Sequence, residues 1–400
     1  MSLSSSSASV GVAVLDRLDD QRGLIDEESQ FLAVFRKFVS DRIAPHAETY
    51  DQSSEFPWKN IDALHELSLA SMFLPEWCGG SGCSYLCYLR IVEELSRGCP
   101  STAITFATTF HALNPLLEFG SDELRSRMAS IVHAGGLGAL AITEESGGSD
   151  VRAMKTTITP RADSIVINGS KIYVTNAGVA DFYLVFGKWN SSEHDGDQLC
   201  AVVVDKDAQG FDVMRKEDKM GHRASATAQL VFDDCHLPST NLIGFPGEGL
   251  KILLYALNRS RPSIAAHALG MARAAIDEAV THSNERKQFG HSILDFQGVQ
   301  FMVADLVAKL ALSKSWLCYV GRLVDHKAEN YYIESSILKL AASDLAMEAA
   351  TAAVQLHGGA GYMRGTKVER LFRDAKLSQI FEGANELHRQ HIGRAFLDRA

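Results

Sequence analysis

Four short polar segments interrupt otherwise apolar stretches of the chain and hold residue types that could bind a ligand or transfer a proton. They are TEESGGSD (143–150), VTNAG (174–178), ERKQFG (285–290) and IFEGANE (380–386). The first combines glycines, hydroxyls and backbone N–H groups in one loop, which can approach a planar ring or a phosphate closely. Taken singly, each segment also has an ordinary interpretation as a polar turn, a strand end or a helix terminus.

The fourth segment places Glu382 between Phe381 and Gly383. A carboxylate beside an aromatic ring and a glycine could be a desolvated base with a raised pKa. It could equally be an acid at a helix N-terminus that complements the helix dipole. Local chemistry alone favours the second interpretation.

The common nucleotide and metal motifs are not found in the sequence. The glycines at 79–82 lack the Gly-x-Gly-x-x-Gly spacing, and 358–361 is not followed by Gly-Lys-Ser/Thr. His388 and His391 form an i, i+3 pair that is typical of a helix surface. The seven cysteines include no Cys-x-x-Cys pair, which indicates unpaired thiols in a reducing compartment.

Three regions of different periodicity must position these segments. Apolar residues recur at helical spacing from 27 to 135. Between 138 and 249 the runs 164–174, 181–189, 198–206 and 228–237 alternate as β-strands, and Asn168-Gly169 is typical of a hairpin turn. Long helices return over 257–289, 297–326 and 334–359, and the last ends on glycines as a helix C-cap should.

Composition narrows the function classes. The net charge is −10 without a Lys/Arg block, which argues against nucleic acid as the main partner. No apolar run approaches the roughly 18 residues that a membrane span needs. Residues 1–24 begin with a Ser-rich stretch and are expected to be a disordered tail that fits neither a secretory signal nor an Arg-rich transit peptide. We therefore expect a bacterial cytoplasmic protein, with an organellar matrix left open.

Taken together, the segments resemble the FAD-dependent acyl-CoA dehydrogenase family over nearly the whole chain, in order and spacing. The resemblance is carried by PEWCGGSGCSYLCY (75–88), AITEESGGSD (141–150), INGSKIYVTNAG (167–178), DKMGHRASATAQLVFDDCHLP (218–238), NLIGFPGEGL (241–250), ERKQFG (285–290), VQLHGGAGYM (354–363) and LFRDAKLSQIFEGANELHR (371–389). It implies an α+β fold with an N-terminal helical domain (25–137), a middle β-barrel or sandwich domain (138–249) and a C-terminal four-helix bundle (250–400).

The resemblance also implies a reaction. FAD lies between the β-domain and the C-terminal helices, and the acyl-CoA thioester is sandwiched between the flavin and a glutamate. The glutamate removes the α-proton, a hydride passes from the β-carbon to flavin N5, and a trans-2-enoyl-CoA results. Glu382 matches this base. Some members place the base on the helix near 257–261, where this chain has Ser260, which cannot serve as a comparable base.

The family's ligand contacts carry over residue by residue. The expected FAD contacts are Ile142, Thr143, Ser149, Tyr173, Thr175, Arg286, Gln288, Phe289, Gln297, Gln355, Gly358, Gly359, Ala384 and Glu386. Those from 286 to 289 match a segment that reaches the FAD diphosphate of a neighbouring subunit, and an Arg suits a diphosphate. A homotetramer built as a dimer of dimers is therefore expected, with an electron-transferring flavoprotein as electron acceptor. The expected substrate contacts are Ser149, Asn258, Arg261 and Gly383.

Some positions depart from the family pattern. Asn258 stands where Asp is common, Ala384 where Thr is common, Glu145 where Pro is usual, and Tyr173 where many members have Trp. These departures leave open a carrier-protein thioester in place of free CoA, an oxidase on the same scaffold, or a catalytically silent flavoprotein.

The acyl group is tied to the helix at 102–115, which matches the one that lines the acyl pocket. Phe106 and Phe110 share a face of this helix at i, i+4. If that face lines the pocket, the acyl group is short or branched; packing of both rings in the core is an equal alternative.

Overall fold

The computed structural model describes residues 14–16, 23–191 and 198–397. An N-terminal set of helices covers α2 (Asp26–Phe38), a π-helical segment (Val39–Ile43), α3 (Ala47–Ser53), α4 (Trp58–Glu66), α5 (Leu69–Met72), α6 (Tyr85–Gly98), α7 (Pro100–Phe119) and α8 (Asp122–His133). Ser84 caps α6 by accepting from the Cys87 N–H, and Ser121 caps α8 in the same way through Leu124. Helix α7 is buried along most of its length, so it is the central layer of this region.

The middle region is one twisted sheet with its own core. Its strands are β1 (Gly138–Ala141), β2 (Thr157–Pro160), β3 (Ser164–Thr175), β4 (Phe182–Trp189), β5 (Leu199–Asp205), β6 (Phe211–Lys216), β7 (Thr227–Pro238) and β8 (Leu242–Ile243). The order is β6-β7-β3-β2-β4-β5-β8, with β1 paired to β4 in parallel. Apolar residues on one face, such as Tyr183, Phe211 and Phe232, pack on one another, which explains the alternation in the sequence.

One detail of the predicted sheet is wrong. Asn168-Gly169 does not make a hairpin turn but lies inside β3, at a register irregularity opposite β7. Gly169 takes a φ of 145°, and a Cβ at that position would meet Thr156 at 2.6 Å. Asn168 bonds both to the Asp234 backbone N–H (2.8 Å) and, through Nδ2, to the Asp234 carboxylate (3.0 Å). Tertiary pairing with a distant strand therefore turned a hairpin signal into a β-bulge.

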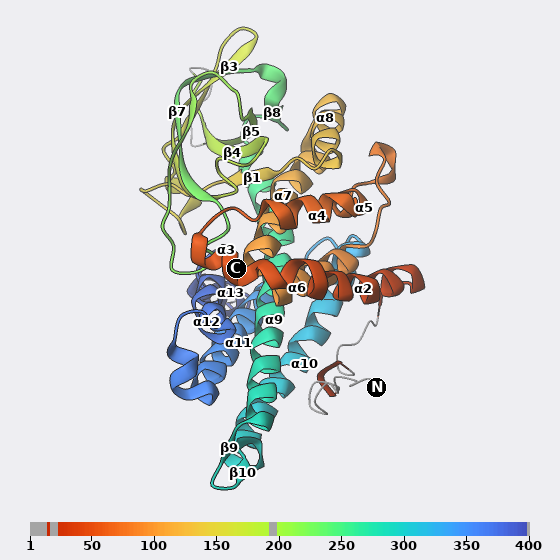
Figure 1. Ribbon diagram of the computed structural model, residues 1–400. Helices are drawn as coiled ribbons and strands as arrows, with labels where there is room; N and C mark the ends of the chain where they lie inside the picture. The colour runs from red at the N-terminus through yellow and green to blue at the C-terminus, as the bar shows by residue number, and fades with distance from the viewer. Residues whose placement is uncertain (1–13, 17–22, 192–197, 398–400) are drawn as a thin grey trace.

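The C-terminal region is a bundle of α9 (Gly249–Glu285), α10 (Gln297–Asp325), α11 (Tyr332–His357), α12 (Lys367–Ser378) and α13 (Asn385–Arg394). The short strands β9 (Lys287–Gln288) and β10 (His291–Ser292) form a hairpin after α9. In Figure 1 the sheet lies at one end of the molecule and this hairpin at the other, with α9 running between them. Helix α9 therefore separates the polar segments of the β-domain from those of the hairpin.

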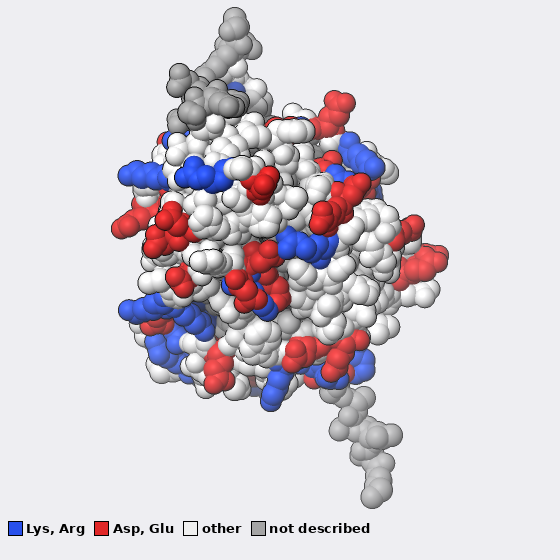
Figure 2. Space-filling model, turned by 90° about the horizontal axis from the view of Figure 1, so that it is seen from above, with Lys and Arg blue, Asp and Glu red and all other residues white. Residues whose placement is uncertain are grey.

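Residues at the chain start and on the surface complete the description. Leu15 is buried and Arg273 binds the Asp16 carboxylate (2.6 Å), although disorder was expected for residues 1–24; the rest of that tail lies outside the described residues. Basic and acidic side chains are interspersed on the face shown in Figure 2. Among the described helices, none is long and apolar enough to cross a membrane.

Candidate active site

Glu382 lies in the turn that joins α12 to α13, in a backbone conformation that few non-glycine residues adopt. Its φ is 52° and that of Gly383 is 96°. The turn directs the Glu382 side chain to α9, where Ser260 Oγ donates a hydrogen bond of 2.6 Å to Oε2. Only 16% of the side chain is exposed. A left-handed, partly buried glutamate fits a residue held for function better than an acid that only complements a helix dipole.

Buried groups of α11 hold this turn from below. Lys339 Nζ donates to the Gly383 carbonyl (2.7 Å) and to Asn385 Oδ1 (2.9 Å). The amide of Asn385 in turn donates to Ser343 Oγ (2.9 Å) and to Asp344 (2.7 Å). Burial lowers the pKa of Lys339 to about 7, with the Glu382 carboxylate acting in the opposite direction. Lys339 was not predicted from the sequence, because a lysine in an Ala-rich helix carries no signal of burial.

We expect Lys339→Met to impair the base without removing it. The Gly383 carbonyl loses its donor, so the Glu382 turn relaxes, and misplacement of a catalytic group by about 1 Å can cost roughly 10²-fold in rate. Stopped-flow measurement of substrate-dependent flavin reduction checks this, with retained flavin confirming the fold. The matched control is Lys309→Met, whose ammonium pairs with Glu348 at the surface. An unchanged rate in Lys339→Met would show that the turn holds its conformation without the lysine.

Two further side chains lie near the carboxylate. His111 Nδ1 is 4.0 Å from Glu382 Oε1, and burial lowers the pKa of His111, which keeps the imidazole neutral. Arg261 is buried, donates to Asn258 Oδ1 (3.2 Å) and stacks its guanidinium 5.1 Å from the Tyr332 ring centre. The expected substrate contacts Asn258, Arg261 and Gly383 thus lie around Glu382.

His388 also belongs to this region, and its interpretation as a surface residue was wrong. Its ring is fully buried, and a Cβ on Gly383 would meet its Nε2 at 3.0 Å. The i, i+3 spacing with His391 was correct, but the turn that carries Glu382 folds over the first histidine. Gly383 is therefore required twice, by its positive φ and by the close ring.

The expected flavin contacts of the β-domain come together at the end of β1. The Ile172 N–H donates to the Thr143 carbonyl (2.9 Å), which places the loop 142–149 beside β3. Tyr173 has a φ of 57° and is 66% exposed. The loop and the bare ring form one surface on which a planar ring can lie.

A buried ion pair fixes this loop. Lys171 Nζ donates to Glu144 Oε1 (2.7 Å) and to the Ile142 carbonyl (3.0 Å). Glu144 also accepts the Lys155 N–H (2.5 Å) and the Thr156 N–H (3.0 Å), and its pKa is lowered because these hydrogen bonds outweigh burial. Ile142 and Thr143 are therefore held rigidly, whereas Ser149 lies on the exposed part of the loop.

Packing links this surface to Glu382. Thr175 pairs with Thr227 at the end of β3, and the segment just before β7 carries His222. The His222 ring stacks on His267 of α9 at 5.1 Å, and His267 meets Phe381 edge-on at 6.4 Å. The flavin-facing strand and the turn of Glu382 are therefore two sides of one contact region.

The remaining expected FAD contacts form a second group at the far end of α9. Arg286, Gln288 and Phe289 lie on the exposed β9–β10 hairpin, with 89% of Phe289 in contact with solvent. The segment of Gln355, Gly358 and Gly359 joins them there through the His282–His357 ring stack at 4.1 Å. Gln297, exposed, begins α10 directly after the hairpin. Figure 1 shows this end of the molecule opposite the sheet, so one chain does not bring the two groups together.

The two groups together fit FAD. An exposed aromatic ring with a loop of N–H groups suits the flavin, and an exposed Arg on a hairpin suits the diphosphate. Ala384 caps α13 and Glu386 lies in its first turn, so both flank the Glu382 turn. The residues fit the cofactor only if a second copy supplies the hairpin group.

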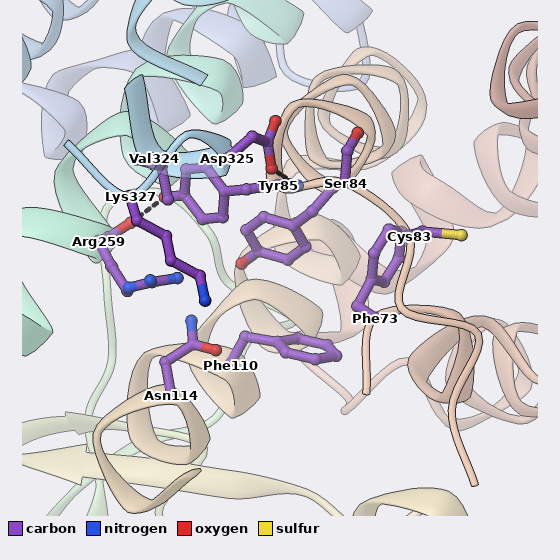
Figure 3. A pocket seen from close by; sticks show the side chains of 11 residues that line it. Phe73, Cys83, Ser84, Tyr85, Phe110, Asn114, Arg259, Val324, Asp325 and Lys327 are labelled. Carbon is purple, nitrogen blue, oxygen red and sulfur yellow. Dashed lines mark hydrogen bonds between the residues drawn. The ribbon is translucent and has the colours of Figure 1, made fainter. Parts of the chain in front are cut away.

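The residues expected to line the acyl pocket divide. Phe110 lines a pocket of about 210 Å³ together with Phe73, Tyr85, Tyr88 and Arg259, shown in Figure 3. Phe106 is not among its lining residues and packs on Phe110 at 5.2 Å in the aromatic core. The helical face of 106 and 110 thus has both of the roles considered.

Comparison with known proteins agrees with this architecture. Three acyl-CoA dehydrogenase domains match the chain: N-terminal (25–135), middle (139–235) and C-terminal (247–397). A probable acyl-CoA dehydrogenase, YngJ of Bacillus subtilis, is 36% identical and covers 94% of this chain and 99% of its own.

Two solved structures are also similar. Butyryl-CoA dehydrogenase from Megasphaera elsdenii superposes with a TM-score of 0.90 at 34% identity, covering 94% of this chain and 99% of its own. A chain from a structure described as the electron transferring flavoprotein of Acidaminococcus fermentans superposes with a TM-score of 0.91 at 36% identity, covering 95% and 100%. The chain belongs to the acyl-CoA dehydrogenase family of flavoprotein oxidoreductases.

Proposed function

We propose that this protein oxidises a short or branched acyl-CoA thioester to its trans-2-enoyl-CoA, with Glu382 as the base that takes the α-proton. The observation that carries the proposal is the placement of Glu382, partly buried and left-handed, between α9 and the flavin-facing surface. Bound FAD would supply the hydride acceptor for the β-carbon. All other roles fall to side chains and backbone groups of the chain.

Binding of the thioester would orient the α C–H toward Glu382. In the described part of the chain the Glu382 N–H has no hydrogen-bond acceptor, so it is free for the thioester oxygen, where negative charge develops as the proton leaves. Ser260 holds the carboxylate through its Oε2. Arg261, already bonded to Asn258, is a fixed positive charge beside the base.

The acyl chain length follows from the pocket. Phe73, Tyr88 and Phe110 fill the space between α6, α7 and α9, which leaves about 210 Å³. Such a volume suits a short or branched acyl group. The similarity to a butyryl-CoA dehydrogenase agrees with that size, and the match to a chain from an electron-transferring flavoprotein structure supports such a protein as electron acceptor.

Anaerobic titration of the purified flavoprotein with acyl-CoA esters tests this proposal. We expect butyryl-CoA or isobutyryl-CoA to bleach the flavin absorbance at concentrations where palmitoyl-CoA does not. Fast reoxidation in air would assign the protein as an oxidase. Failure of every CoA ester to bleach the flavin would contradict the proposal and direct the search to carrier-protein thioesters.

A shared cofactor site makes a second prediction, on mixed oligomers. Glu382→Gln lacks the base, and Arg286→Glu places a carboxylate where the diphosphate should bind, so each alone is expected to be inactive. Co-expressed chains should recover activity, because a site that combines Glu382 of one copy with Arg286 of the other is intact. Activity is measured after purification through two different tags. A mixed oligomer as inactive as its parents would contradict a site shared between copies.

A further inference from the structure

A continuous row of buried polar groups leads away from Glu382 on the side opposite the flavin-facing surface. His111 Nε2 lies 3.1 Å from Ser263 Oγ, and Ser263 Oγ lies 3.1 Å from Tyr88 Oη. Three different helices, α7, α9 and α6, contribute one member each. All three residues are at most 3% exposed, so these groups have only one another and nearby backbone as partners.

The row ends at a pocket that reaches the surface. Tyr88 lines the pocket of Figure 3, whose other walls include Asn114, Arg259, Asp325 and Lys327. Asp325 and Lys327 are exposed, and in Figure 3 the polar ends of Lys327 and Asn114 point toward one another. A pocket with so many polar groups suits water.

The hydrogen-bond geometry specifies a direction. Burial keeps His111 neutral, so only one ring nitrogen carries a proton. If Nε2–H donates to Ser263, Nδ1 is an acceptor that faces a carboxylate, another acceptor. Two acceptors cannot bond, which accounts for the 4.0 Å between Nδ1 and Oε1. Once Glu382 gains a proton it becomes a donor, and a small rotation closes this gap.

We propose that His111, Ser263 and Tyr88 relay the proton of Glu382 to the pocket while the enoyl product still covers the other side of the carboxyl group. This inference rests on the proposed function and adds a route for proton release to it. Glu382 Oε1–H passes its proton to His111 Nδ1, Nε2–H to Ser263 Oγ, Ser263 O–H to Tyr88 Oη, and Tyr88 O–H to water in the pocket. One proton enters and one leaves, and no residue gains charge overall.

Concerted transfer suits these groups, because a buried imidazolium would be costly. A half-turn of the imidazole ring and rotation of the two hydroxyls restore the starting arrangement. The three residues act through Glu382 and touch no reacting carbon, so they are positioning residues for its proton.

The test measures proton release and flavin reduction in the same single turnover. Holoenzyme in weak buffer with a pH indicator is mixed anaerobically with whichever of butyryl-CoA and isobutyryl-CoA bleaches faster. In the wild type, one proton should appear in the same phase as bleaching. Tyr88→Phe removes only the terminal hydroxyl, so bleaching should stay within about twofold while the proton appears at least tenfold later, with product release.

Two further variants make the test specific. Ser263→Ala interrupts the row at its middle and suits a helix, so it should delay the proton equally even if Tyr88→Phe folds poorly. Tyr85→Phe is the matched control, because Tyr85 lines the same pocket but donates to the Arg259 carbonyl. Early proton release in both Tyr88→Phe and Ser263→Ala, or late release in the wild type, would overturn the relay alone. Absence of bleaching by every ester would overturn the proposed function and the relay with it.

Discussion

Glu382→Gln is expected to retain FAD and to lose substrate-dependent flavin reduction by on the order of 10²–10⁴-fold, the usual contribution of a positioned general base. Glutamine has nearly the same shape, and its amide can still meet Ser260 Oγ, which now contacts the carboxylate at 2.6 Å. The fold and the cofactor site should therefore remain. The loss would fall on the chemical step, because an amide cannot accept the α-proton.

The measurement is anaerobic stopped-flow bleaching with butyryl-CoA, at equal flavin content. Glu348→Gln on the outer face of α11, where the carboxylate pairs with Lys309 at 2.6 Å, is the matched control and should behave as wild type. If Glu382→Gln bleached at the wild-type rate, the base would have to be sought elsewhere, and the row from His111 to Tyr88 would lose its proton source.

Lys171→Met should cause a large loss of stability, because it leaves Glu144 charged and unpaired in the β-domain. Lys171 is fully buried and Glu144 is 5% exposed in this pair, with 2.7 Å between Nζ and Oε1. Removal of one partner of a buried pair typically costs about 3–5 kcal/mol. The loop of Ile142 and Thr143 would loosen as well, so FAD should dissociate more readily.

Chemical unfolding of the holoenzyme and flavin retained after gel filtration measure both effects. The double variant Lys171→Met, Glu144→Gln removes both charges and should recover most of the lost stability. Lys206→Met, which breaks a pair with Asp181 that is partly open to solvent, should cost at most about 1 kcal/mol. Equal losses for Lys171→Met and Lys206→Met would mean that the buried pair does not stabilise the loop.

Periodicity predicted the long elements of the fold well, since their apolar faces are repeated over many residues. The helix expected at 297–326 is Gln297–Asp325, and the strand expected at 164–174 is Ser164–Thr175. The short strands β1 and β2 were not predicted, since four residues carry too little pattern. The Asn168-Gly169 turn failed because a partner strand some 66 residues away set the local geometry.

The candidate site divides in the same way. Glu382 could be singled out only through the order of motifs along the chain, because local chemistry favoured a helix-capping acid. Lys339, His111 and Ser263 could not be identified at all, since their roles come from burial and from contacts between helices far apart in sequence. The hairpin of Arg286 lies far from the sheet, which is the feature that makes a second copy necessary.

The most direct test of the central claim is the isotope effect of α-deuteration on anaerobic flavin bleaching by butyryl-CoA. If Glu382 removes the α-proton, the α-deuterated ester should bleach the wild-type flavin several times more slowly than the ordinary ester, and neither should bleach Glu382→Gln at a comparable rate. Equal rates for the two esters, together with rapid bleaching in Glu382→Gln, would contradict the assignment of Glu382 as the base.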